Sequence, residues 1–261
     1  MKDYKIALQV HSVREAFAEN PNETLAEIAK MGYDGIEFNY GARGEYTAEQ
    51  YRQALDEVGL KCYSAMGGWS DFSKDNIDAT AAYLSVLGVE HIVIGMVDFS
   101  VIDANPDAVK DVVEHMRWVN EHLKSLGFKS GYHAHDADYT HTVDGVPFYE
   151  YVMENIPSDF GMTVDTGNIM AGGGDPIACL KKFPGRSPVL HIKGYGKEKR
   201  YTTPVWESEL DWTELFTTAR DVSSTEIFYI EFGARADYDP KERAAKSCEW
   251  LKSWVSKINT I

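Results

Sequence analysis

Met31-Gly32-Tyr33 places a glycine between the end of a helix-like stretch and an apolar residue that leads into a strand-like run. The same order returns at Val58-Gly59-Leu60, Leu87-Gly88-Val89 and Leu126-Gly127-Phe128. Glycine readily takes the left-handed conformation that ends a helix, and the next apolar residue closes the cap against the last turn. Four such junctions in the first half of the chain predict a succession of strand–helix units.

Eight short apolar runs are the candidate strands of these units. They span residues 5–10, 35–39, 61–66, 91–97, 129–135, 161–165, 189–193 and 227–232. Eight strands in strict alternation with eight helices predict an α/β protein, a (β/α)₈ TIM barrel whose eight-stranded parallel sheet closes on itself. The length of 261 residues is normal for one such barrel, so we expect residues 1–261 to form a single domain.

Several of the intervening segments begin with the signals of a helix start. Thr47 and Gln50 have the spacing of a capping box, and Asn105-Pro106, Asp175-Pro176 and Asp239-Pro240 place a capping side chain before a proline. A doubly wound open sheet is the rival fold. It usually carries a glycine-rich phosphate turn after its first strand, where this chain has Gln9-Val10-His11-Ser12-Val13-Arg14.

The composition argues against several classes of protein. A formal charge of −15 opposes a nucleic-acid surface, although a short basic patch is present at Lys193, Lys197, Lys199 and Arg200. No run approaches the roughly 18 apolar residues that a membrane helix needs. The three cysteines are widely spaced and predict buried or inert thiols in a reducing compartment. With a charged N-terminus and no signal peptide, we expect a cytoplasmic protein.

Polar residues interrupt the apolar runs at the C-terminal ends of the last four strands, where barrels of this type carry their chemistry. His133 and His135 share one face of strand five, and His191 lies in strand seven. Asp165 ends strand six, although it could merely cap the next helix. Glu231 lies in an apolar run, where an unpaired carboxylate would cost several kcal/mol. These residue types predict one divalent metal site formed by His133, Asp165, His191 and Glu231.

Other polar and aromatic residues are expected near the same mouth and are candidates for binding substrate. They are Gln9, His11, Glu37, Trp69, Asn168, Trp206 and Glu207. Four of these residues also have a purely structural interpretation. The two tryptophans could simply pack, Glu37 could form a salt bridge to a barrel lysine or arginine, and Asn168 could stabilise a turn. His91 lies at a strand start, the end of a barrel that serves stability, and is given no functional role.

Over nearly its whole length, the chain resembles the xylose-isomerase-like TIM barrel superfamily, specifically its sugar phosphate isomerase/epimerase proteins. The motifs that carry the resemblance are Leu8-Gln9-Val10-His11-Ser12-Val13-Arg14, Gly32-Tyr33-Asp34-Gly35-Ile36-Glu37-Phe38, Tyr132-His133-Ala134-His135-Asp136, Asp165-Thr166-Gly167-Asn168 with Gly174-Asp175-Pro176, and His191-Ile192-Lys193. The resemblance implies a metal ligand on each of strands five to eight, usually Glu, Asp, His and Glu, often with Mn²⁺, Mg²⁺ or Co²⁺. Asp165, His191 and Glu231 match by position, whereas His133 stands where the family has Glu.

The residues and the resemblance together predict an enzyme, a metal-dependent isomerase or epimerase that acts on a sugar or keto-sugar through an enediolate stabilised by the metal. One divalent ion is expected, Mn²⁺ first, with Zn²⁺, Co²⁺ or Mg²⁺ as alternatives. Glu231 is the expected base, and His135 or Lys193 the complementary acid. Because His133 replaces a glutamate, the two-carboxylate mechanism of the family's epimerases does not transfer unchanged.

Three other functions stay open. In a metal-dependent keto-sugar lyase or dehydratase, the same enediolate would lose an oxygen from its β-carbon. The histidine of strand five makes this function almost as well supported as isomerisation or epimerisation. An abasic-site endonuclease shares the superfamily fold but needs further metal ligands and a basic groove. A non-catalytic sugar-binding barrel needs neither tightly bound metal nor a working base. We expect a small-molecule sugar partner, no nucleic acid and no membrane, and we leave a homo-oligomer open.

Overall fold

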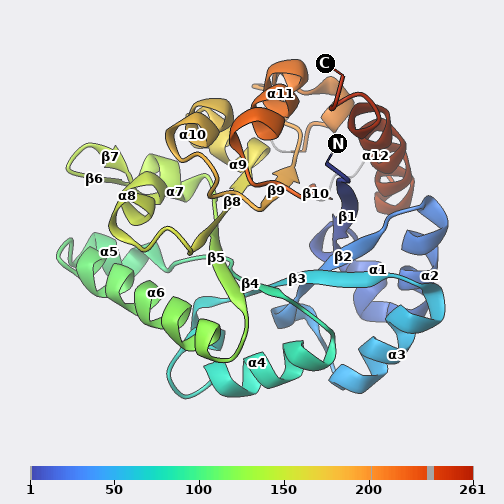
Figure 1. Cartoon of the computed structure of the whole chain (residues 1–261), viewed down its shortest axis with the longest axis horizontal. Coiled ribbons are helices and arrows are strands. Elements are labelled where there is room, and N and C mark those ends of the chain that lie inside the picture. Colours follow the sequence, from blue (N-terminus) through green and yellow to red (C-terminus); the bar gives the residue numbers. More distant parts are fainter. Residues whose placement is uncertain (1, 201, 234–237, 261) are drawn as a thin grey trace.

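The computed structural model describes residues 2–200, 202–233 and 238–260. Within these ranges, eight parallel strands close into a barrel in the order β1-β10-β9-β8-β5-β4-β3-β2, and the helices lie around its outside (Figure 1). The barrel strands are β1 (Lys5–Gln9), β2 (Gly35–Asn39), β3 (Lys61–Gly67), β4 (His91–Ile94), β5 (Lys129–His133), β8 (Gly161–Asp165), β9 (Val189–Ile192) and β10 (Ile227–Ile230). The predicted (β/α)₈ fold is confirmed, and the open doubly wound sheet is excluded.

The helices follow the strands along the chain, and the last of them, α12, packs beside β1 and α2 (Figure 1). They are α1 (Arg14–Glu19), α2 (Pro21–Met31), α3 (Ala48–Val58), α4 (Ile77–Val86), α5 (Phe99–Ala104), α6 (Ala108–Ser125), α7 (Ala137–Thr140), α8 (Phe148–Asn155), α9 (Thr166–Ala171), α10 (Pro176–Lys182), α11 (Trp212–Val222) and α12 (Pro240–Val255). Short 3₁₀ helices are η1 (Val10–Val13), η2 (Tyr40–Ala42), η3 (Trp69–Phe72) and η4 (Val205–Glu207). The prediction of one helix after each strand was too simple, because short helices precede several of the long ones.

The glycine junctions have the backbone that their sequence predicts. Gly32, Gly59, Gly88 and Gly127 have φ values between 74° and 91°, in the left-handed region. In three of these junctions the amide of the next apolar residue donates to a carbonyl five residues earlier, as Leu60 does at 3.0 Å. Each of these helices therefore ends within two residues of its glycine, and the chain turns back toward the barrel.

The predicted helix starts are confirmed in three of four places. Thr47 and Gln50 form the capping box of α3, and Asp175 and Asp239 cap α10 and α12 ahead of a proline. The Asn105-Pro106 prediction was wrong about the start of α6, which begins at Ala108. The Asn105 side chain instead accepts a hydrogen bond from the amide of Asp107, within the turn that joins α5 to α6.

Strands β2 and β8 have the predicted bounds, whereas several others end before the predicted residue. β5 stops at His133 instead of residue 135, β9 at Ile192 instead of 193, and β10 at Ile230 instead of 232. Single hydrogen bonds carry the pairing slightly further, such as the one from the amide of Glu231 to the carbonyl of Ile192 at 3.3 Å. The residues beyond these strand ends therefore belong to the loops that form the barrel mouth.

Apolar side chains between the strands and the outer helices form the main core, and Ala7, Val189 and Tyr229 form a separate small apolar cluster in the barrel interior. Buried polar side chains occupy much of the remaining interior. The three cysteines are buried and form no disulfide, as their spacing predicts. Among the described residues, none of the helices combines the length and apolar character needed to cross a bilayer.

Candidate metal centre

Four predicted ligands come together at the C-terminal end of the barrel. His133 ends β5, Asp165 ends β8, His191 lies in β9 and Glu231 directly follows β10. These strands lie side by side in the barrel wall in the order β10-β9-β8-β5, so their inward-facing residues point toward one space. One ligand atom from each residue lies within 4.8 Å of the other three, and all four residues are buried.

The contacts within this cluster are close, but they leave potential ligand atoms without a hydrogen bond in the described chain. His133 Nε2 lies 3.3 Å from Asp165 Oδ2 and 3.6 Å from Glu231 Oε2. His191 Nδ1 lies 2.6 Å from Glu231 Oε2 and 3.9 Å from Asp165 Oδ2. Both ring nitrogens of His133 and Oδ2 of Asp165 are buried and have no hydrogen-bond partner in the described chain. Such atoms are rarely left unpaired in proteins, and a cation bound by Nε2 of His133 and Oδ2 of Asp165 would satisfy these two.

The charges of the barrel interior also fit a divalent cation. Glu37, Asp165 and Glu231 are buried carboxylates, and the nearby cation is Lys193, whose Nζ lies 2.8 Å from Glu231 Oε1 and 3.6 Å from Asp165 Oδ2. Among the described residues, these three carboxylates, when ionised, and the Lys193 ammonium carry a net charge of −2 while His191 is neutral, as it must be to bind a metal. A divalent ion would balance this charge, and two imidazoles with two carboxylates are suitable ligands for Mn²⁺, Zn²⁺ or Co²⁺.

The ionisation of these groups follows from their neighbours. Burial favours neutral carboxyls, but the Lys193 ammonium and contacts with His133 hold the pKa of Asp165 below its usual range. Burial is likewise overcome at Glu231, where Lys193 and His191 hold the pKa well below the ordinary value. Burial lowers the pKa of His191, but the carboxylates of Glu37 and Glu231 outweigh it and raise that pKa to about 10. The cluster therefore keeps its carboxylates charged and attracts positive charge.

A cavity of about 340 Å³ opens onto the cluster. Its lining consists of Gln9, His11, Asn39, Gly41, Met66, Gly67, Gly68, Asp71, Gly95, Met96, His133, His135 and Glu231. Gln9, His11 and His135 were expected in this mouth, and the structure places them there. Nδ1 of His135 is buried without a hydrogen-bond partner in the described chain. Burial, followed by the effects of His133 and Lys193, lowers the pKa of His135 to about 3, so its ring is neutral near pH 7.

Glu37 and Asn168 lie near the cluster, but neither lines this cavity. Glu37 is fully buried and contacts Gln9, Ser64 and His191, so its ionic partner is a histidine and not the lysine or arginine considered from the sequence. The amide of Asn168 donates to Asp165, and its side chain donates to the carbonyl of Ala134. The contacts of Asn168 fit the turn-stabilising alternative, and substrate contact by Glu37 or Asn168 stays a prediction.

Trp69, Trp206 and Glu207 also lie outside the lining of this cavity. The ring of Trp69 packs against His115 at a centroid distance of 4.8 Å. Trp206 lies in η4, with Nζ of Lys246 4.0 Å from its ring centre. Glu207 forms an ion pair with Lys199 at 2.9 Å. The packing alternative fits both tryptophans, and this arrangement brings none of the three residues to the cluster.

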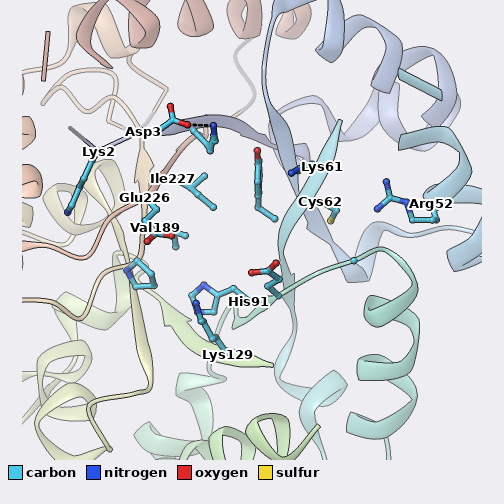
Figure 2. Close-up of a pocket in the computed structure, with 15 residues that line it drawn as sticks. Lys2, Asp3, Arg52, Lys61, Cys62, His91, Lys129, Val189, Glu226 and Ile227 are labelled. Carbon is cyan, nitrogen blue, oxygen red and sulfur yellow. Dashed lines mark hydrogen bonds and ion pairs between the residues drawn. The ribbon is translucent and has the colours of Figure 1, made fainter. Parts of the chain in front are cut away.

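A second hollow, of about 630 Å³, opens at the opposite end of the barrel, among the first residues of the strands (Figure 2). Lys61, His91 and Lys129 contribute to its lining (Figure 2). Glycines on the neighbouring strands make room for the imidazole, because a Cβ at Gly131 or Gly161 would come 3.1 Å from His91 Nε2. His91 therefore lies at the N-terminal end of the barrel, opposite the end that carries the four candidate ligands.

The closed barrel and the ligand cluster at its C-terminal end define a TIM-barrel protein with a candidate metal centre. Residues 25–254 match the family model described as xylose isomerase-like TIM barrel, and the chain belongs to that family. This membership confirms the resemblance seen in the sequence and the expectation of an enzyme.

Individual relatives are distant but match over most of their length. The chain is 24% identical to an inosose dehydratase of Mesomycoplasma hyopneumoniae (strain 7448), over 90% of this chain and 89% of that protein. A crystal structure of a sugar phosphate isomerase/epimerase from Parabacteroides distasonis has a TM-score of 0.77 at 20% identity, covering 97% of this chain and 95% of that one. The structure of the IOLI protein with a bound zinc atom has a TM-score of 0.72 at 13% identity, covering 98% and 100%.

Proposed function

We propose that this protein is a divalent-metal-dependent enzyme that eliminates water or an alcohol from a small keto-sugar, a dehydratase or lyase. The observation that carries the proposal is the group of four buried ligands, His133, Asp165, His191 and Glu231, beside a cavity that also contains the neutral ring of His135. Similarity to a protein named inosose dehydratase supports elimination as the outcome.

The surroundings of Glu231 argue against its predicted role as the base. Its Oε1 lies 2.8 Å from Lys193 Nζ, and its Oε2 lies 2.6 Å from His191 Nδ1. Both oxygens of this carboxylate are thus engaged by neighbouring side chains, which leaves them poorly placed to take a proton from a substrate. His135 is neutral and lines the cavity, and its Nδ1 has no protein partner in the described chain, so we assign the proton acceptor to His135.

The metal, when bound, would act as a Lewis acid that stabilises the negative charge developing on the substrate's carbonyl and adjacent hydroxyl oxygens. His135 removes the proton from the carbon next to the carbonyl, and the C–H electron pair becomes the double bond of an enediolate. That pair then expels the oxygen on the β-carbon as the C–O bond breaks. His135 returns its proton to the departing oxygen, so a neutral water or alcohol leaves and an unsaturated ketone remains.

Isomerisation or epimerisation is the second candidate, because it shares the first proton transfer with elimination. It is favoured by the likeness to a sugar phosphate isomerase/epimerase structure and by the presence of both His135 and Glu231 in the cavity lining. In this alternative the proton returns to carbon instead of oxygen. For the ion we keep Mn²⁺ as the first expectation and Zn²⁺ as the alternative, which a zinc-bound structural relative supports.

The experiment that separates these outcomes incubates the Mn²⁺- or Zn²⁺-loaded protein with a panel of cyclic keto-sugars and keto-polyols in D₂O. Elimination produces a conjugated ketone with new ultraviolet absorbance, whereas isomerisation or epimerisation introduces deuterium into a saturated sugar. Asp165→Asn, which removes a ligand charge, is the control and should abolish either signal. A metal-loaded protein that binds these sugars without either signal would contradict the proposal and indicate a non-catalytic barrel.

A further inference from the structure

Glu37 is a charged residue inside the barrel whose two carboxylate oxygens both have protein partners. Oε2 accepts a hydrogen bond from Gln9 Nε2 at 2.6 Å and lies 2.8 Å from His191 Nε2. Oε1 accepts a hydrogen bond from Ser64 Oγ at 2.7 Å. A fully buried carboxylate needs such partners, since an unpaired one would carry a large desolvation cost. The side chain is therefore held by residues of three strands.

His191 lies between this carboxylate and the ligand cluster. Its Nε2 faces Glu37, and its Nδ1 faces Glu231 and Asp165 at 2.6 and 3.9 Å. A neutral imidazole carries one hydrogen, and only the nitrogen without it can bind a metal. Carboxylates lie beside both ring nitrogens: Nδ1 is hydrogen-bonded to Glu231, and Nε2 lies close to Glu37 without a hydrogen bond in the described chain. Once a cation occupies Nδ1, the ring hydrogen is on Nε2, where it faces the Glu37 carboxylate. Histidine ligands of metals are commonly oriented by a carboxylate in this way.

The backbone is arranged so that Glu37 meets its partners. Gln9 of β1 pairs directly with Glu37 in the parallel register of β1 and β2. Between β2 and β3 the register shifts after Ile36, so that Ser64, and not Tyr63, pairs with Glu37. Irregularities of this kind often re-aim a side chain near a functional site. Ser64 Oγ also lies 2.8 Å from the hydroxyl of Tyr229, which extends the buried polar contacts toward the middle of the barrel.

We infer that Glu37 is a positioning residue of the metal centre, which fixes the ring of His191 so that Nδ1 binds the cation. The inference rests on the metal site of the proposed function, and it replaces a substrate-binding role for Glu37. Glu37 acts on the metal through His191, because the carboxylate itself does not line the substrate cavity.

The first test compares the metal affinity of Glu37→Gln with that of Ser64→Ala, the matched control. Ser64→Ala removes one buried hydrogen bond to Glu37 but leaves its contact with His191. Glu37→Gln should weaken Zn²⁺ binding by roughly 10- to 100-fold and alter the visible spectrum of the Co²⁺-loaded protein, whereas Ser64→Ala should change the affinity by less than about threefold. Chelator competition measures the affinity, and the spectrum reports the ligand geometry without any substrate.

Equal affinities in the wild type and Glu37→Gln, or equal losses in both variants, would overturn the inference. If Glu37→Gln does not fold, the tautomer can be read in the Zn²⁺-loaded wild type from ¹⁵N chemical shifts of its histidines, with His191 assigned by substitution. The expected result is a hydrogen on Nε2 and metal on Nδ1, and the reverse would contradict us. A wild type that binds Zn²⁺ in this manner but transforms no sugar refutes the proposed function and leaves the role of Glu37 intact.

Discussion

His133 and His135 are separated by a single residue at the end of β5, yet their surroundings give them different roles. His133 points into the ligand cluster, with Nε2 3.3 Å from Asp165. His135 lies beside the cavity, its ring centre 4.6 Å from that of His133 and tilted by 79° against it. A candidate ligand and the proposed proton acceptor thus lie next to each other at the end of β5.

Replacing His135 tests its assignment as the proton acceptor. His135→Asn should reduce kcat by about 100- to 10,000-fold and leave the bound metal unchanged, because the substitution removes a base but no ligand. Turnover of the keto-sugar identified in D₂O measures the loss, and metal analysis checks occupancy. His141→Asn is the matched control, since His141 is a partly exposed histidine paired with Asp103 at 3.2 Å. A His135→Asn enzyme with near-normal kcat would return the role of base to Glu231.

At the residue scale, the sequence predicted the four ligands because each stands at the C-terminal end of a recognisable strand. The contacts of Glu37 were harder to predict from the sequence. Its partner His191 comes from β9, which is not a neighbour of β2 in the barrel, and Ser64 faces it through a register shift. Sequence reasoning missed Ser64 and Tyr229 altogether, since a hydroxyl inside an apolar strand carries no signal of its partner.

Among the elements, the helix ends depend on glycine most clearly at Gly127, where φ is 91° and a Cβ would meet no atom within 4 Å. Gly127→Ala should therefore lower the free energy of unfolding by roughly 1 kcal/mol through backbone strain alone, without a steric clash. Gly127→Asn should lose less, because asparagine tolerates the left-handed conformation better than alanine does. Urea unfolding measures both changes, and an alanine variant as stable as the asparagine variant would contradict this explanation.

The elements that sequence reasoning missed are short. A hairpin of β6 (Thr142–Val143) and β7 (Val146–Pro147) is joined by Asp144-Gly145, both with positive φ. The Asp-Gly signal was available, but strands of two residues show no alternation to reveal them. The strand ends at the mouth were placed up to three residues too late, because apolar and histidine residues continue there after the neighbouring strand has turned away.

For the whole molecule, the buried charges link metal binding to stability. Lys193 neutralises part of the charge of Asp165 and Glu231, at 3.6 and 2.8 Å. A metal present at a hundredfold excess over its Kd should stabilise the wild type by about 2.7 kcal/mol. Thermal unfolding with and without Mn²⁺ or Zn²⁺ measures this gain, and a Tm indifferent to both ions would argue against the site.

Lys193→Met distinguishes the stabilising effect of the lysine charge from that of the bound metal. Without metal the variant should be destabilised by about 3 kcal/mol or more, because two buried carboxylates lose their ammonium partner. With metal it should recover more stability than the wild type does, since the ion no longer shares these carboxylates with a cation. Denaturant unfolding at matched metal concentrations gives both values. Equal metal-induced gains in the variant and the wild type would show that Lys193 does not compete for the site.

The most direct test of the account is a crystal of the metal-loaded protein, with anomalous diffraction recorded at the absorption edge of the added ion. We predict one strong peak among His133, Asp165, His191 and Glu231, with Nδ1 of His191 facing it, and no such peak in Asp165→Asn. An empty cluster at saturating Mn²⁺, Zn²⁺ and Co²⁺, with the four side chains bonded only to one another and to Lys193, would contradict the central claim.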